Sequence, residues 1–366
     1  MGFQCGIVGL PNVGKSTLFN ALTATANAEA ANYPFCTIEP NVGRVAVPDP
    51  RLAEIARLAK SARVVPTQLD FVDIAGLVRG ASKGEGLGNQ FLSHIREVDA
   101  IAHVLRCFED DNVTHVEGAV DPVRDAEIVE TELMLADLES LEKRIPAAQK
   151  KSRGQDDAAR TQLALMERAA ELLREGQLAR LLEIDDAERP LFQQLQLLTA
   201  KPVLYVCNVE EAAAATGNDQ ARRVEARARE LGAEAVIVSA EIEAEVAQLA
   251  DDEEKAAFLE SLGLAESGLA RIIQAGYALL DLITFFTAGP KEARAWTVRR
   301  AATAPEAAGA IHSDFQRGFI CAETISYEDY VRHGGEAGAK DAGRLRQEGR
   351  DYIVRDGDVI LFRFNV

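Results

Sequence analysis

The segment Gly9–Ser16 has the residue types and spacing of a loop that binds phosphate, with glycine at its first and sixth positions and lysine and serine at its end. Glycines allow backbone N–H groups to turn inward around phosphates, Lys15 offers a charge to the β- and γ-phosphates, and the Ser16 hydroxyl suits magnesium. An apolar run precedes the loop and a helical pattern follows it, as the motif requires. These residues predict a nucleoside triphosphate site, contacted by Asn12, Val13, Gly14, Lys15, Ser16 and Thr17.

A second motif, Asp73–Gly76, directly follows the apolar run Leu69–Val72. A carboxylate at the end of a strand can hold the water shell of magnesium, and a glycine amide can contact the γ-phosphate. Thr37 can supply a second hydroxyl to the metal, although it also fits a threonine at a sheet edge. We therefore expect Ser16, Thr37 and Asp73 to bind Mg²⁺, and Lys15 and Gly76 to act in catalysis.

The residue that would orient the attacking water is not evident after Gly76. Leu77 stands where related nucleotide hydrolases carry glutamine, and its side chain cannot orient water. Slow intrinsic turnover follows, with another group or a partner setting the rate. His115 is one candidate, although it fits a solvated loop histidine equally well. A potassium ion held by Asn12 is another.

The pocket for the base is expected after the apolar run Val203–Cys207. Guanine-specific sites carry Asn-Lys-x-Asp there, whereas this chain has Asn208, Val209 and Glu211 at the corresponding places. A pocket without the lysine and with a longer carboxylate should lose specificity for guanine, so adenine could be read by backbone groups near Val209. Ser239 and Ala240 end the next strand and should line the base. A degraded guanine site is the alternative.

The elements that position these motifs follow from short apolar runs that alternate with helical patterns over the first 280 residues. Such alternation predicts an α/β fold with a mostly parallel sheet covered on both faces, whose ligands bind at the carboxyl ends of the strands. The expected strands are Phe3–Val8, Leu69–Val72, Ala100–Leu105, Val203–Cys207 and Ala235–Val238.

Two other regions depart from this alternation. Leucines at near-helical spacing predict an inserted helical hairpin over residues 128–199 with its tip at Ser152–Asp156, although two ordinary surface helices remain possible. Expected strands at Leu282–Thr287, Trp296–Arg299 and Val359–Phe364 and a helix at Ala304–Ile311 predict a small α+β domain over 282–366. The nucleotide-binding domain would then comprise residues 1–127 and 200–281.

The composition limits the location and the partners. A net charge of −18 argues against strong non-specific binding to nucleic acid or anionic membranes, and we expect no membrane association and no specific DNA site. Five scattered cysteines argue against a disulfide framework, and no signal peptide or membrane-spanning run is evident. We expect a cytoplasmic protein. Cys36 beside Thr37 could respond to oxidation, although packing as a small hydrophobic residue explains Cys36 and Cys5 equally well.

These motifs together resemble the YchF family of Obg-related P-loop ATPases and GTPases, in the translation-factor branch. The resemblance extends over almost the whole chain. It rests on Met1–Lys15, Pro34–Asn41, Phe71–Gln90, Asn208–Glu211, Ala308–Phe315 and Asp351–Val354.

The resemblance implies a Ras-like P-loop domain, an inserted coiled-coil domain and a C-terminal TGS domain with a ubiquitin-like β-grasp fold. It also implies hydrolysis of ATP in preference to GTP and binding to the ribosome, at its large subunit, through the helical and TGS-like domains. The alternatives are a guanine-specific GTPase of the same fold and an RNA-binding module with incidental hydrolysis. In the latter, Lys143, Arg144, Lys150, Lys151 and Arg153 would contact RNA, although a solvated helix tip also explains this cluster.

Overall fold

The computed structural model describes residues 3–30, 42–74, 87–110, 118–154, 156–249 and 251–365. Its contacts divide the chain into two compact units. The first unit contains Phe3–Gly43 and Asp70–Gly276, and the second contains Arg44–Leu69 and Tyr277–Val366. The sequence placed residues 44–69 in the nucleotide-binding domain, whereas the contacts group them with the C-terminal region.

A six-stranded sheet in the order β2-β4-β1-β5-β6-β7 carries the expected strands. β1 is parallel to both β4 and β5, and β5, β6 and β7 continue in parallel. All five strands predicted for this region are confirmed within two residues at each end, and β2 is additional. Their bounds are β1 Gln4–Val8, β2 Val42–Ala46, β4 Gln68–Asp73, β5 Ala100–Arg106, β6 Val203–Asn208 and β7 Glu234–Val238.

Helices connect these strands, as expected for parallel neighbours, which need crossover connections. The helices of the α/β region are α1 Lys15–Ala30, α3 Leu87–Glu97, α7 Asp219–Glu230, α8 Ala240–Val246, α9 Asp252–Ser261 and α10 Gly268–Leu279. A short 3-10 helix covers Glu211–Ala213. Within the described residues, no helix is long and apolar enough to cross a bilayer.

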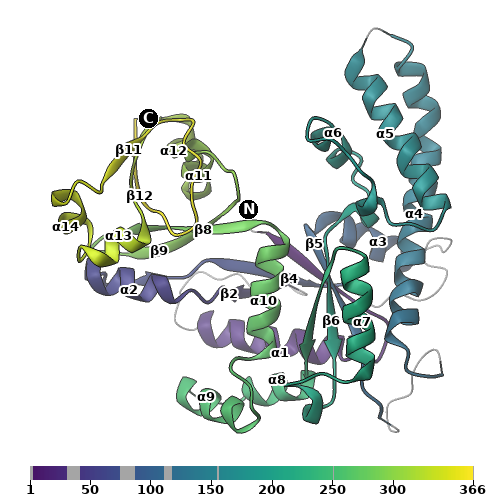
Figure 1. Cartoon of the computed structure of the whole chain (residues 1–366), viewed down its shortest axis with the longest axis horizontal. Coiled ribbons are helices and arrows are strands. Elements are labelled where there is room, and N and C mark those ends of the chain that lie inside the picture. The colour runs from purple at the N-terminus through teal and green to yellow at the C-terminus, as the bar shows by residue number, and fades with distance from the viewer. Residues whose placement is uncertain are drawn as a thin grey trace. The chain divides into compact units, whose positions relative to one another are not determined.

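Between β5 and β6, two long helices lie side by side, α4 (Pro122–Lys151) and α5 (Asp157–Arg174), as Figure 1 shows. They share a core that includes Leu141, Leu165 and Leu173. The chain returns to β6 through α6 (Arg189–Gln193) and two 3-10 helices, Ala179–Leu181 and Leu198–Ala200. The expected tip at 152–156 separates the two helices.

The second unit contains a mixed sheet in the order β11-β10-β12-β8-β9-β3. β8 and β9 form an antiparallel pair, β12 lies parallel to β8, and β10 is antiparallel to β12. This is the strand order of a β-grasp fold, with the two-residue strand β3 added beside β9. The strands are β3 Val64–Val65, β8 Leu282–Ala288, β9 Ala293–Arg299, β10 Phe319–Ile325, β11 Arg346–Glu348 and β12 Val359–Phe364.

One helix of the second unit, α11 (Ala304–Ile311), occupies the predicted residues. A capping box between Thr303 and Glu306 defines its start, and Ala304, Ala307 and Ala308 pack into a core with Phe285 and Phe362. The remaining helices are α2 Pro50–Ala59, α12 Ser313–Arg317, α13 Tyr327–Arg332 and α14 Glu336–Asp341.

Helix α2 is amphipathic and is defined at both ends. The Asp49 side chain caps its first turn, Pro50 has the backbone angle that a first helical residue needs, and Lys60 ends it in the left-handed conformation with φ of 54°. Leu52 and Ile55 are buried in a core with strands of the C-terminal region. Burial of each of these two side chains stabilises the fold by about 2 kcal/mol.

Candidate nucleotide-binding site

The phosphate-binding loop connects β1 to α1 and is shaped by close packing. A Cβ on Gly9 would lie 2.7 Å from the Val104 carbonyl oxygen, so only glycine fits there. Asn12 and Gly14 have φ of 63° and 90°, which turns the backbone into a concave loop before α1 begins at Lys15. Consecutive N–H groups in such a loop, together with the N-terminus of α1, form an anion site. A cavity of about 460 Å³ lies over this loop, lined by Leu10, Pro11, Asn12, Gly14, Lys15, Ser16 and Thr17. Val13, which the sequence also predicted at the site, is buried and does not line it.

Lys15 and Asp73 meet at the carboxyl edge of the sheet. β1 and β4 are parallel, with Ile7 opposite Asp73, so the end of β4 lies beside the start of the loop. The Lys15 amine donates to the Asp73 carboxylate, and both side chains are largely buried. A triphosphate competes with Asp73 for the same amine.

The oxygen donors at this edge fit magnesium. The Ser16 hydroxyl is exposed at the first turn of α1, and the Asp73 carboxylate ends β4. Mg²⁺ in nucleotide sites binds one or two protein oxygens together with phosphate oxygens. No cluster of three or more His, Cys, Asp or Glu side chains that could hold a metal by itself occurs within the described ranges. Phosphate oxygens would therefore complete the shell.

A second cavity, of about 410 Å³, lies next to the loop and has the position expected for the base. Three segments form its walls: the loop and α1, the residues after β5, and the ends of β6 and β7. The lining residues are Asn12, Gly14, Thr17, Phe108, Glu109, Asp110, Asn208, Val209, Glu210, Ser239, Ala240 and Glu241.

Asn208 joins two of these walls. Its Nδ2 donates to the Val13 carbonyl at 2.9 Å, and its Oδ1 accepts from the Ala240 amide at 2.9 Å. The side chain is buried, and a Cβ on Gly14 would lie 2.2 Å from its Nδ2. Asn208 therefore fixes the phosphate loop relative to the base cavity, and Gly14 leaves room for it.

The wall after β5 was not predicted from the sequence. Arg106 is fully buried, donates from Nε to the Phe108 carbonyl at 3.1 Å and from Nη2 to the Asp110 carbonyl at 3.2 Å, and lies over the Phe108 ring. It thereby holds Phe108 against the cavity. The only sequence signal was that this segment directly follows an expected strand of the sheet.

Ser239 offers a hydroxyl to a ligand in this cavity. Its Oγ is buried, and no hydrogen-bond partner lies within reach of it in the part of the chain that the structure describes. A buried polar atom without a partner is costly, and a bound base or ribose could supply one. Ser239 thus suits its predicted role of lining the base.

The structure brings together most of the residues that the sequence singled out. Asn12, Gly14, Thr17, Asn208, Val209, Ser239 and Ala240 line the base cavity, and Lys15 and Ser16 line the phosphate cavity. Glu210, not the expected Glu211, lines the base cavity, and Glu211 begins a 3-10 helix. Thr37, Gly76, Leu77 and His115 lie outside the described residues, as does Cys36.

Cys5 lies on β1 and is fully buried. Burial raises the pKa of its thiol to about 12, which keeps it protonated at neutral pH. Since the thiolate is the reactive form, this environment favours packing over redox chemistry for Cys5.

Family models and known proteins match this chain. A model described as "50S ribosome-binding GTPase" matches residues 4–135, and the "YchF-GTPase_C" model, described as "Protein of unknown function (DUF933)", matches residues 282–365. Proteins named "Ribosome-binding ATPase YchF" from Escherichia coli O157:H7 and Bacillus subtilis are 55% and 54% identical to this chain, over the whole length of each. The chain belongs to the YchF family.

Solved structures agree with this membership. The YchF GTPase of Schizosaccharomyces pombe superposes with a TM-score of 0.89 at 38% identity, covering 99% of this chain and 98% of that one. A GTP-binding protein of Pyrococcus horikoshii, with a TM-score of 0.60 at 19% identity, shares the fold. The expected P-loop fold is confirmed, and the "YchF-GTPase_C" model covers the region in which we expected the TGS-like domain.

Proposed function

We propose that this chain is a ribosome-associated ATPase of the cytoplasm that acts as a nucleotide-dependent switch and hydrolyses ATP in preference to GTP. The observation that carries the proposal is the base cavity, in which Val209 occupies the place of the lysine in guanine-specific sites. Relatives that match the whole chain are named ribosome-binding ATPases, which supports the same function.

The backbone around Val209 favours adenine. The Val209 N–H donates to the Val238 carbonyl at 2.8 Å, so this donor is already used within the sheet. The Val209 carbonyl is an acceptor, which suits the 6-amino group of adenine and repels the 6-oxo group of guanine. Glu210 lines the cavity in place of Glu211, so the carboxylate that would accept from the guanine N1–H and 2-amino group is displaced by one residue. Discrimination against GTP follows from these two features.

Hydrolysis at this site relies on positioning and charge. Loop amides and Lys15 would hold the phosphates, and Ser16 and Asp73 would hold Mg²⁺, which would neutralise charge on the phosphoryl oxygens. Thr37, Gly76 and His115 remain predicted contributors, and so does a potassium ion at Asn12. Equal turnover in potassium and sodium buffers would remove that ion from the mechanism.

Binding to the ribosome is proposed through the helical hairpin and the C-terminal TGS-like domain. Lys150, Lys151 and Arg153 are exposed at the tip of the hairpin, where they can meet RNA phosphates. Arg144 has a structural role instead, because its Nη1 donates to the Leu195 carbonyl at 2.8 Å. The large subunit is the expected binding partner.

Two assays test this function. Phosphate release from ATP should be measurable and should fall at least about 100-fold in Lys15→Gln, since one charged contact to the transferred group is lost. Reversal of charge at Lys150, Lys151 and Arg153 should weaken co-sedimentation with ribosomes and reduce its salt dependence, with ATPase activity retained. Absence of ATP hydrolysis in the wild-type protein would overturn the proposal.

A guanine-specific GTPase is the second candidate, because the matching N-terminal model and the Schizosaccharomyces pombe relative are both named GTPases. Direct competition between ATP and GTP distinguishes the two.

A further inference from the structure

The segment Arg44–Leu69 belongs structurally to the C-terminal region although it lies between the two nucleotide motifs in the sequence. On α2, Leu52, Ile55 and Ala56 share one core with Phe286 and Val359 among others. β3 pairs in parallel with β9, with Val64 opposite Ala293. The Ala293 amide also donates to the Arg63 carbonyl at 2.9 Å. The segment is therefore an integral part of the second unit.

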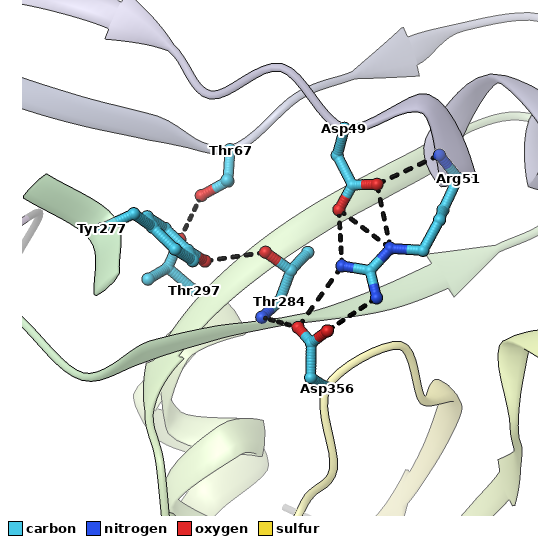
Figure 2. A network of polar contacts seen from close by, with 7 residues as sticks. All are labelled: Asp49, Arg51, Thr67, Tyr277, Thr284, Thr297 and Asp356. Carbon is cyan, nitrogen blue, oxygen red and sulfur yellow. Dashed lines mark hydrogen bonds and ion pairs between the residues drawn. The ribbon is translucent and has the colours of Figure 1, made fainter. Parts of the chain in front are cut away.

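An ion-pair network fixes the start of α2 to the C-terminal region (Figure 2). Arg51 lies between two carboxylates: its Nη1 is 2.7 Å from Asp356 Oδ2, and its Nη2 is 2.8 Å from Asp49 Oδ2. Asp356 also accepts from the Thr284 amide on β8 at 2.9 Å. Burial alone would raise the pKa of Asp356, but the Arg51 hydrogen bond lowers it below its usual value, so the carboxylate stays charged.

A second polar cluster holds the other end of the segment, immediately before β4. The Thr67 hydroxyl hydrogen-bonds the Thr297 hydroxyl of β9. The Tyr277 hydroxyl lies 3.1 Å from Thr297 Oγ1 and 2.7 Å from Thr284 Oγ1 (Figure 2). Thr67 and Thr284 are buried, so these bonds exclude water. Two points of the segment are thus tied to the second unit: Arg51 reaches β8 through Asp356, and Thr67 bonds β9 directly.

β4 continues directly from this cluster to the nucleotide site. The strand begins at Gln68, next to Thr67, and ends at Asp73, which is the ion-pair partner of Lys15. A triphosphate and its metal would exchange the Lys15–Asp73 pair for contacts with phosphate and magnesium. Nucleotide binding would therefore change the contacts of Asp73 at one end of β4. The other end of β4 follows Thr67, which is bonded within the second unit.

We propose that residues 44–69 transmit nucleotide binding to the C-terminal unit, with β4 as the connecting strand and the Arg51 and Thr67 clusters as its attachments. The inference rests on the proposed function, because it assumes that ATP binds beside Asp73. Coupling of this kind is reciprocal, so a partner that binds the C-terminal unit changes ATP affinity by the same factor as ATP changes the affinity for the partner.

Hydrogen exchange of the full-length protein tests the coupling, with magnesium and β,γ-methylene-ATP as the added ligand. The reporter is the peptide covering 290–299, because its Ala293 amide is bonded to Arg63 of the segment. In the wild-type protein, the bound ATP analogue should change exchange in this peptide by about twofold or more. Calorimetry on the same samples establishes that the analogue is bound.

Two variants break the attachments separately, and each has a matched control. Arg51→Gln removes the bridge to Asp356, and Arg57→Gln removes an arginine of the same helix whose partner is Glu54, one turn away on α2. Thr67→Val removes only the hydroxyl that bonds Thr297, and Thr161→Val removes an exposed hydroxyl on α5. Since Thr67→Val nearly preserves side-chain shape, it decides the question if Arg51→Gln fails to fold.

We expect the response of peptide 290–299 to be lost in Arg51→Gln and Thr67→Val and retained in both controls. A response retained in both attachment variants, or absent from wild-type protein that has the analogue bound, overturns the coupling and leaves the ATPase proposal intact. If the wild-type protein does not bind the analogue at all, the proposed function itself fails.

Discussion

The Asn208 side chain donates to the Val13 carbonyl at 2.9 Å and accepts from the Ala240 amide at the same distance. One buried amide therefore connects the phosphate loop, the end of β6 and the start of α8. Asn208 therefore has a scaffold role, and we expect the affinity for the phosphates to depend on it.

Replacing Asn208 with alanine should weaken both the fold and ATP binding. The Val13 carbonyl and the Ala240 amide would lose their partners, which costs about 1–3 kcal/mol in the free energy of unfolding. Urea denaturation measures the loss in the free energy of unfolding, and calorimetry with ATP measures the loss in affinity. Asn20→Ala, on the exposed face of α1, is the control. Unchanged ATP affinity in Asn208→Ala would contradict the scaffold role.

Arg106→Met should impair recognition of the base and spare the phosphates. The variant loses the bonds to the Phe108 and Asp110 carbonyls, so that wall of the cavity loosens. We expect ATP affinity to fall about tenfold, or about 1.4 kcal/mol, with binding of inorganic tripolyphosphate unchanged. Arg144→Met, which breaks an arginine–carbonyl bond in the hairpin, should change neither. Equal losses for both ligands would mean that Arg106 acts on the whole site.

Restoring the guanine-specific residues tests the assignment of the base pocket. Val209→Lys combined with Glu211→Asp recreates Asn-Lys-x-Asp. GTP should then gain affinity relative to ATP by about tenfold, because the guanine edge gains about one hydrogen bond to a charged group. Competition between fluorescent nucleotides gives the ratio. Glu175→Asp, an exposed substitution in the hairpin, is the control. An unchanged ratio would show that these two positions do not set base preference.

The stability of the first unit should depend on pH through His103. This histidine lies on β5 beside Tyr205, is 2% exposed, and burial lowers its pKa from 6.5 to about 4. The unfolded chain therefore binds the proton first, so stability is fully present above pH 6.5 and declines as the pH falls towards 4. The total loss is about 3 kcal/mol.

Urea unfolding at pH 7.5 and at pH 5 measures this dependence. His103→Gln should flatten it. The same slope in wild type and His103→Gln would assign the pH dependence to other groups.

The sequence predicted those features that local chemistry determines. The phosphate loop follows from the spacing of its glycines and lysine, and helix Ala304–Ile311 follows from Thr303 and Glu306, which cap it. The strands β1, β4, β5 and β6 are short buried runs whose apolar composition marks them directly. The placement of Ser239 and Ala240 at the cavity follows from the rule that ligands bind at strand ends.

Features that depend on distant partners escaped prediction. Leu52 and Ile55 mark α2 as amphipathic, but their spacing cannot tell that its apolar face packs on strands of the C-terminal region. β3 consists of two residues, too short for any periodic signal, and only pairing with β9 defines it. Arg106 resembles any charged residue at a strand end, and its role emerges from the turn that brings the Phe108 and Asp110 carbonyls to its guanidinium.

Calorimetric titration of the purified protein with ATP and with GTP, each with and without magnesium, tests the central claim most directly. We expect ATP to bind at least about tenfold more tightly than GTP, since the Val209 carbonyl can accept from the 6-amino group of adenine and repels the 6-oxo group of guanine. Magnesium should strengthen binding of both nucleotides through Ser16 and Asp73. Tighter binding of GTP than of ATP would contradict the account.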